Sequence, residues 1–399
     1  NELKLRASYG QTGNQEGIRL YDYIQLLKFR DDGWGTKLIY PFGNGSQSQA
    51  MGLDVLAGVD RTWEILENVN VGVDAAFLDS RLGFSFDYFV KMNNNMLIPV
   101  TYPSMLGAEA PYSNSGKLRT NGFELTLNWT DKIGNVEYSA QFQLTDAVNK
   151  LVEYGGADTY KLGLNETREG YPMNSYFAYV YDGVIKDQAD LDAYKKLEGV
   201  PSNIGIGDAK FKDLNGDGKI STYGDKDGDD GDAEYVGSTT PRYSFGLNLG
   251  AKWNNFDISV FFQGVAKRTL FREGDFAMPW SDWWRYPPQF YYGQTWNEDR
   301  PDAYYPRLTH GEIRHWNYQA STLQKINAAY IRLKNIQIGY TLPKGALQKL
   351  GIERTRFYVS GQDLFEIHNV KGGWDPESDK AGFNYPFQRY YSFGIDLTF

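Results

Sequence analysis

The dominant pattern along the chain is an alternation of apolar and polar positions with a period of two. At the C-terminal end the apolar positions are Tyr391, Phe393, Ile395, Leu397 and Phe399, and the residues between them are small or polar. Because a β-strand points successive side chains to opposite faces, such a segment has one apolar face and one polar face. The same pattern predicts about ten strands, at 3–9, 69–77, 81–91, 122–130, 135–145, 243–253, 255–264, 329–341, 355–364 and 389–399.

The connections between these strands alternate between short and long. Short helices are expected only at 189–197 and 345–350. Strands of about ten residues with short periplasmic turns and long extracellular loops are typical of a transmembrane antiparallel β-barrel. The alternative is a soluble all-β protein, such as a lectin-like sandwich or a propeller, although no repeat of about 40 to 50 residues supports a propeller. The long connections, which we expect outside the cell, lie near 10–68, 92–121, 146–242, 265–328 and 365–388.

The amino-acid composition excludes several classes of binding and catalytic site. The 399 residues contain 41 Lys and Arg against 50 Asp and Glu, and this net charge of −9 disfavours binding to a nucleic-acid backbone. Without cysteine, the chain has no disulfide, zinc–thiolate site or cysteine nucleophile. Three histidines leave little room for histidine-based catalysis, and His310 and His315 are interpreted as ordinary loop residues. The chain starts inside a strand-like run, as expected of a segment of a longer protein.

Several long motifs stand out along nearly the whole chain. They are LKLRASYGQTGNQ (3–15), FDYF (86–89), NSGKLRTNGFELTLNW (114–129), EGYPMNSYFAYVYDGV (169–184), DLNGDGKIS (213–221), TTPRYSFGLNLGAKWNNFDISVFFQGV (239–265), AAYIRLKNIQIGYTLP (328–343) and YSFGIDLTF (391–399). In sequence and in order, these motifs resemble the SusC/RagA family of TonB-linked outer-membrane transporters.

The resemblance implies an active importer in the outer membrane of a Bacteroidetes-type envelope. Such transporters work with a SusD-like surface lipoprotein and the TonB complex, take up glycans or peptides, and often form pairs of transporter–lipoprotein units. Their barrels close at about 22 strands, so residues 1–399 are expected to be the C-terminal part of the barrel. The plug domain and TonB box of the family are not in this chain, and we expect contact with TonB to involve that missing N-terminal part.

The apolar residues of the last strand (Tyr391, Phe393, Ile395, Leu397 and Phe399) predict an assembly signal. A terminal aromatic residue on an exposed strand edge suits recognition by strand addition before the barrel closes. The alternative is that Phe399 only packs at the lipid interface.

The stretch from Asp213 to Ser221 matches the start of a calcium-binding loop. Oxygen ligands are expected from the side chains of Asp213, Asn215 and Asp217 and the carbonyl of Lys219, with Asp225 closing the site. We therefore predict a structural Ca²⁺ ion and no organic cofactor. The alternative is a solvated acidic loop rich in Asx turns.

A long connection carries a dense group of aromatic residues. Flat rings beside polar side chains suit stacking on sugar rings or docking of a protein partner, and the alternative is that the rings pack the loop against itself. The candidate ligand- or partner-binding residues are Trp280, Trp283, Trp284, Tyr286, Phe290, Tyr291, Tyr292 and Trp296.

The leading hypothesis is thus a non-enzymatic outer-membrane importer, with glycan favoured over peptide as the ligand. A passive porin-like channel and a surface glycan-binding protein are the alternatives.

Overall fold

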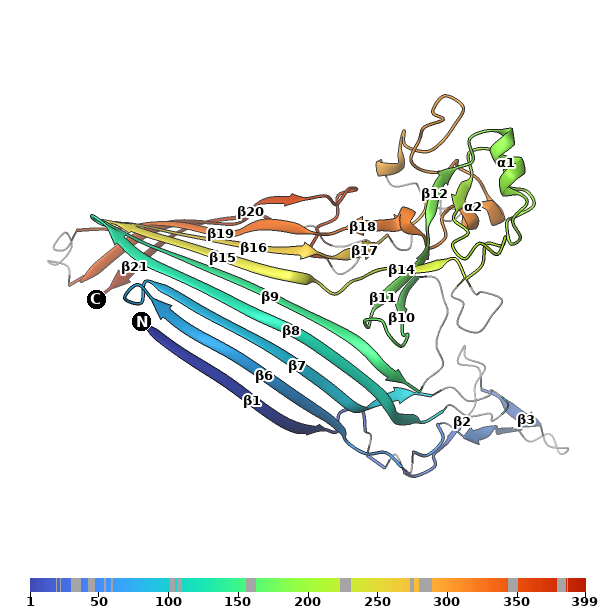
Figure 1. The fold of residues 1–399 in the computed structure, drawn as a ribbon, viewed down its shortest axis with the longest axis horizontal. Helices are drawn as coiled ribbons and strands as arrows, with labels where there is room; N and C mark the ends of the chain where they lie inside the picture. The colour runs from blue at the N-terminus through green and yellow to red at the C-terminus, as the bar shows by residue number, and fades with distance from the viewer. Residues whose placement is uncertain are drawn as a thin grey trace.

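The computed structural model describes residues 1–399 except 19, 22, 30–36, 42–46, 54, 59, 101–104, 106–109, 156–162, 223–230, 273–275, 280–288, 344–350, 379–384 and 386. One ten-stranded antiparallel sheet dominates it, in the order β1-β6-β7-β8-β9-β15-β16-β19-β20-β21 (Figure 1). These strands are β1 (Glu2–Asn14), β6 (Glu64–Phe77), β7 (Leu82–Pro99), β8 (Tyr112–Ile133), β9 (Val136–Tyr154), β15 (Arg242–Trp253), β16 (Phe256–Lys267), β19 (Tyr330–Thr341), β20 (Arg354–His368) and β21 (Tyr390–Thr398). Each lies on one of the ten strands predicted from alternation, and the all-β antiparallel prediction is confirmed.

The apolar positions of the sheet lie on one face. Along β9 and β15, Phe142 pairs with Leu247 and Leu144 with Phe245, while the intervening pairs are polar or glycine. Within the described part of the chain this face is not covered by a second layer: the exposed fractions are 56% for Val71, 81% for Phe393 and 60% for Ile395. The apolar rings are therefore not packed between two sheets, as a sandwich would require. An uncovered apolar surface of this extent marks contact with lipid or another protein.

The opposite, polar face carries two arginine–aspartate networks. Arg6 on β1 donates to Asp87 at 2.6 and 2.9 Å and to Asp74 at 2.9 Å. Arg356 on β20 donates to Asp257 on β16 at 2.6 and 2.9 Å. To reach Asp257, its side chain crosses β19 over Gly339. A Cβ atom at Gly339 would approach the Arg356 guanidinium to 2.4 Å, so the missing side chain makes room for the charge.

Strand length differs across the sheet. β7, β8 and β9 have 18, 22 and 19 residues, whereas β15 and β16 have 12 each. The alternation pattern indicated about ten residues for β8, because the stretch 112–121 is polar and small. Pairing with β7 over Tyr112–Trp129 and with β9 over Gly116–Ile133 holds this polar stretch as a strand.

The short turns lie at one end of the sheet with both chain termini, and the long connections lie at the other (Figure 1). Two of these connections, within 170–238 and 268–328, fold together into a unit that we name the loop domain. Its elements are β11 (Ser175–Tyr179), β12 (Tyr181–Val184), α1 (Gln188–Tyr194), β13 (Ala209–Phe211), β14 (Ala233–Ser238), β17 (Thr269–Phe271), η3 (Gln289–Tyr291), α2 (Gly311–Asn317), η4 (Thr322–Gln324) and β18 (Lys325–Asn327). The remaining short strands are β2 (Leu27–Phe29), β3 (Ile39–Pro41), β4 (Gln47–Gln49), β5 (Met51–Leu53) and β10 (Gly163–Glu166).

Of the two predicted helices, the one at 189–197 is confirmed as α1. It begins where the Asp187 side chain accepts a hydrogen bond from Asp190 N at 2.9 Å, a standard N-cap, and it buries Leu191 and Tyr194. The helix predicted at 345–350 lies outside the described residues. None of the described helices is long and apolar enough to cross a membrane.

Candidate functional site

The loop domain has its own hydrophobic core, which the sheet lacks. Tyr194 of α1 is central: its hydroxyl accepts from Phe211 N at 2.8 Å and is 3.3 Å from Phe211 O. Burial raises the pKa of Tyr194 well above the ordinary tyrosine range. The hydroxyl therefore stays protonated and acts as a structural hydrogen-bonding group. The buried core residues are Tyr179, Ile185, Leu191, Tyr194, Ile204, Ala209, Phe211, Ile220 and Ile313.

Asp208 fastens the two connections of the loop domain to each other. Its side chain is fully buried and accepts hydrogen bonds from Arg307 at 2.6 and 2.8 Å. Asn317 of α2 donates to the same carboxylate at 2.9 Å, and Gly205 N donates at 2.7 Å. The Asp208 hydrogen bond raises the pKa of Arg307. Sequence reasoning missed this group because its members are about a hundred residues apart and carry no motif.

The aromatic residues predicted to bind a ligand or partner differ in their exposure, and four of them are not described. Trp280, Trp283, Trp284 and Tyr286 lie outside the described residues. Tyr291 is 2% exposed and donates to Phe276 O at 3.0 Å, whereas Tyr292 beside it is 89% exposed. The Phe290 ring packs against Tyr291 at a centroid separation of 4.2 Å, with the ring planes tilted by 35°. Of these described rings, Tyr292 is the one most open to a ligand.

Tyr291 belongs to a second buried cluster, with Tyr305, Tyr318 and Leu323. Arg272, itself buried, lies 5.1 Å from the Tyr305 ring and donates hydrogen bonds to the Tyr305 hydroxyl and to Leu323 O. Burial raises the pKa of Tyr291 and of Tyr318 far above the ordinary range. The cluster therefore presents neutral rings around one buried cation, an arrangement that stabilises the loop domain.

Trp296 packs on the backbone of the loop that carries Asp208. Gly207 has a φ of +88°, and a Cβ atom there would lie 2.2 Å from the Trp296 ring. Only glycine meets both requirements. Trp296 is thus half-buried and is held in place by the loop domain.

The predicted calcium loop is compact in its described part. Both carboxylate oxygens of Asp213 accept backbone N–H groups, from Gly216 at 2.7 Å and Gly218 at 2.9 Å, and Asn215 donates to Asp217 at 3.0 Å. Among the described residues no group of three or more His, Asp or Glu side chains is close enough to hold a metal ion. The fifth expected ligand, Asp225, lies outside these residues, and Ca²⁺ at Asp213, Asn215, Asp217 and Lys219 stays a prediction.

Asp232 closes the same loop and was not found from the sequence. It is fully buried and accepts from Leu214 N at 2.7 Å and from Ser221 N at 2.8 Å. Burial raises its pKa, and the negative charges of Asp213 and Asp217 raise it further. A run of acids after Ser221 gave no signal to single out Asp232.

A charged cluster ties the segment after β20 to the polar face of β19. Arg332, almost fully buried, pairs with Asp375 and, at 3.1 Å, with Glu377. Lys334 lies 2.8 Å from Glu377 and 3.1 Å from Asp363. The described part of this long connection is therefore held on the polar face.

Four of the five residues of the predicted assembly signal lie on β21, and Phe399 follows its last residue. Tyr391, Phe393, Ile395 and Leu397 share the apolar face, and the exposed fraction of Phe399 is 77%. Within the described part of the chain, β21 pairs with β20. The assembly signal stays a prediction.

Comparison with known proteins adds sequence similarity to this geometry. TonB-dependent receptor P3 of Formosa agariphila is 27% identical over 430 residues, covering 99% of this chain. The chain is similar from end to end to TonB-dependent receptors. TonB-dependent receptor P26 of the same organism is 26% identical over 429 residues, covering 100% of the chain. These relatives are receptors and not enzymes, in agreement with the prediction from sequence. No protein-family model matches the chain.

Solved structures share the fold of this chain. The RagAB peptide transporter superposes on the whole chain with a TM-score of 0.73 at 22% identity. The closed-closed state of the RagAB peptide importer gives the same score at 24% identity. The chain covers 41% of either structure, and 39% and 40% of the two receptors. It thus spans about two fifths of the length of the relatives it matches, and the resemblance to the SusC/RagA class is confirmed.

Proposed function

We propose that the chain forms the C-terminal part of the barrel of an outer-membrane importer of the SusC/RagA class. The observation that carries the proposal is a single antiparallel sheet with an uncovered apolar face and a charged polar face. Lipid on one side and an aqueous passage on the other satisfy both faces. The whole-length similarity to TonB-dependent receptors supports the same function.

The two ends of the sheet then have different roles. The end with short turns faces the periplasm, and the loop domain faces the outside of the cell. A surface lipoprotein of the SusD kind is the proposed partner of the loop domain, and TonB energises transport through a plug domain. Two such transporter–lipoprotein units assemble as a pair. No step of this mechanism is catalytic, since transport rests on binding and gating.

An oligosaccharide is the proposed ligand. Exposed rings in the loop domain, such as Tyr292 and Tyr304, suit stacking on sugar faces. The second candidate is a peptide, because the solved structures that share the fold include a peptide importer. A passive channel and a surface binding protein differ from both in needing no energy.

Uptake by living cells tests the function. Cells with and without the full-length gene are given labelled oligosaccharides or labelled peptides, before and after the proton-motive force is collapsed. Gene-dependent uptake that stops on collapse supports an energised importer, and the label that enters identifies the ligand class. Gene-dependent uptake that survives collapse indicates a passive channel, and surface binding without entry indicates a binding protein. Trp280→Ala with Trp284→Ala tests the aromatic loop in the same assay.

A further inference from the structure

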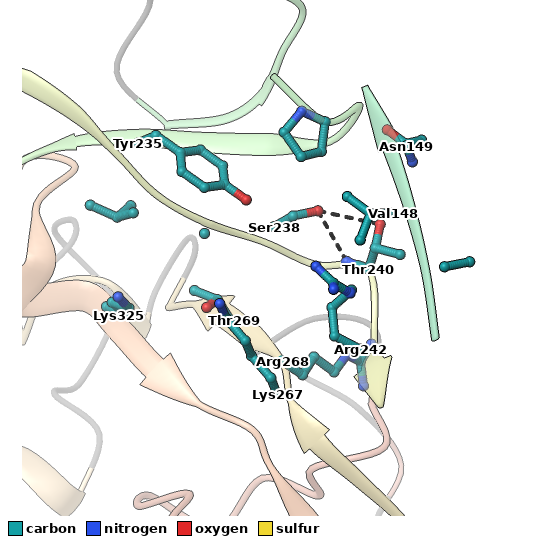
Figure 2. Close-up of a pocket in the computed structure, with 14 residues that line it drawn as sticks. Val148, Asn149, Tyr235, Ser238, Thr240, Arg242, Lys267, Arg268, Thr269 and Lys325 are labelled. Atoms are coloured by element: carbon teal, nitrogen blue, oxygen red, sulfur yellow. Dashed lines mark hydrogen bonds between the residues drawn. The ribbon is translucent and has the colours of Figure 1, made fainter. Parts of the chain in front are cut away.

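A cavity of about 250 Å³ lies where the loop domain meets the sheet. It lies between residues 147–149 of β9 and the start of β15, and β14, β17 and the start of β18 complete its walls (Figure 2). We name it the cationic pocket. Its lining residues are Ala147, Val148, Asn149, Pro172, Tyr235, Val236, Gly237, Ser238, Thr240, Arg242, Lys267, Arg268, Thr269 and Lys325.

The charge of this lining opposes that of the whole chain. Four of the fourteen lining residues are Lys or Arg and none is Asp or Glu, although acids outnumber bases 50 to 41 in the sequence. The four cations come from β15, β16, the residue after β16, and β18. Lys267 and Arg268 are adjacent in the sequence, and the fold brings them together with Arg242 and Lys325.

Two of the cations are fixed in position. Arg242 forms a bidentate pair with Asp146, with a distance of 2.6 Å from Nη2 to Oδ2. Arg268 is buried and donates to the backbone carbonyls of Pro376 at 2.9 Å and Thr239 at 3.3 Å. Asp146 offsets the positive charge of Arg242.

The other two cations, Lys267 and Lys325, are exposed. Within the described part of the chain neither forms an ion pair. Each ammonium group carries three donors on a flexible stem, so both can adjust to a bound anion. Figure 2 shows the two side chains approaching the pocket from different strands.

Hydroxyl groups complete the lining. Ser238 Oγ lies 3.3 Å from Thr240 Oγ1, and it accepts from Thr240 N at 3.2 Å. The Tyr235 hydroxyl is directed toward Ser238 in Figure 2. Burial raises the pKa of Tyr235, and the nearby positive charge of Arg242 only partly opposes this rise. The Tyr235 hydroxyl therefore stays protonated and can donate a hydrogen bond.

We infer that the cationic pocket binds one oxyanionic group, a carboxylate, sulfate or phosphate. Lysine and arginine donors with neighbouring hydroxyls are the groups that such oxygens accept from. A water molecule takes about 30 Å³ of liquid volume, so the pocket holds an oxyanion with part of its hydration but not a whole large ligand. The bound anion would link the loop domain to the sheet. The inference is independent of transport, because it rests on the lining alone.

Isothermal calorimetry with sodium sulfate on the full-length protein in detergent, at low ionic strength, tests this inference. Lys267→Ala with Lys325→Ala should weaken sulfate binding by about tenfold for each lysine, where tenfold corresponds to about 1.4 kcal/mol. The matched control is Lys195→Ala with Lys196→Ala, which removes the same charge from an exposed part of the loop domain. Binding lost in the pocket variant and kept in the control supports the site. If sulfate binds equally to the pocket variant and to the control variant, or does not bind to the wild type, the inference is wrong for soluble anions.

The source of the oxyanion is settled by a second measurement on the same samples. Phosphorus analysis of lipid that co-purifies with the wild type and with the pocket variant detects a lipid phosphate held at the pocket. Lipid phosphate that is lost with the two lysines supports the site and assigns a headgroup as its ligand. If neither sulfate nor lipid phosphate depends on these lysines, the pocket binds no oxyanion and the inference is wrong. Heat-modifiable migration of each variant shows that the barrel has folded.

Discussion

Removal of the Asp208 carboxylate should open the loop domain without opening the sheet. Asp208 accepts hydrogen bonds from Arg307 (twice), Asn317 and Gly205, at 2.6 to 2.9 Å. Breaking a buried ion pair by removing one partner costs about 3–5 kcal/mol. The Arg307 side chain is 34% exposed, and water can rehydrate its guanidinium, so we take about 3 kcal/mol for Asp208→Ala. Since about 1.4 kcal/mol is a factor of ten, amide protection in the loop domain should fall about a hundredfold.

Hydrogen exchange read by mass spectrometry on the full-length protein measures this change. Peptides covering 204–211 and 313–319 should lose protection, and peptides from β8 and β9 serve as the internal reference. Asp208→Asn keeps the shape and one acceptor but loses the charge, and should give a smaller loss. The control is Asp182→Ala, because Asp182 is half-exposed and 3.8 Å from Lys212, a pair worth about 0–1 kcal/mol. Unchanged protection in Asp208→Ala, or an equal loss in β8 and β9, would refute the reasoning.

Three further predictions concern the loops and the last strand. Calorimetry should detect Ca²⁺ binding to the full-length protein that is lost in Asp213→Ala with Asp217→Ala, and no binding to the wild type would remove the calcium site. Deletion of Phe399 should lower the amount of barrel assembled in the outer membrane, measured by heat-modifiable migration in membrane fractions, and normal assembly would count against the signal. Burial raises the folded-state pKa of Tyr291 and Tyr318, so their contribution to stability is complete below the ordinary tyrosine pKa of about 10 and is lost as the pH rises through the folded value. Loop-domain exchange, corrected for intrinsic rates, should therefore accelerate above about pH 10 before exchange of β8 does, and parallel acceleration of both would contradict this.

The sheet could be predicted from the sequence because its signal is local and periodic. Residues 391–399 alternate without exception, and β21 covers Tyr390–Thr398. In the first half of β8, pairing with neighbouring strands extends the strand beyond the apolar alternation. Helix α1 was also predictable, since Asp187 caps it and Leu191 and Tyr194 lie on one face.

The loop domain could not be predicted because its contacts join distant segments. Asp208 and Arg307 meet across 99 residues, and no spacing or motif links them. α2 has no capping side chain: His310 precedes it in an extended conformation without a side-chain hydrogen bond to the helix. The cationic pocket was missed for the same reason, since Arg242 and Lys325 reach the adjacent Lys267 and Arg268 only when separate strands fold together.

The uneven lengths of the strands have a mechanical consequence. With 22 residues, β8 spans about 75 Å at about 3.4 Å per residue, whereas about ten residues suffice to cross the hydrocarbon of a bilayer with a tilted strand. In such a bilayer, β7, β8 and β9 would extend well beyond the lipid headgroups as a hydrogen-bonded sheet. The shorter strands β15 and β16 would end closer to the membrane surface. One side of the proposed entrance would then be formed by hydrogen-bonded backbone, so its height would be set by strand pairing and not by the side chains of the connecting loops.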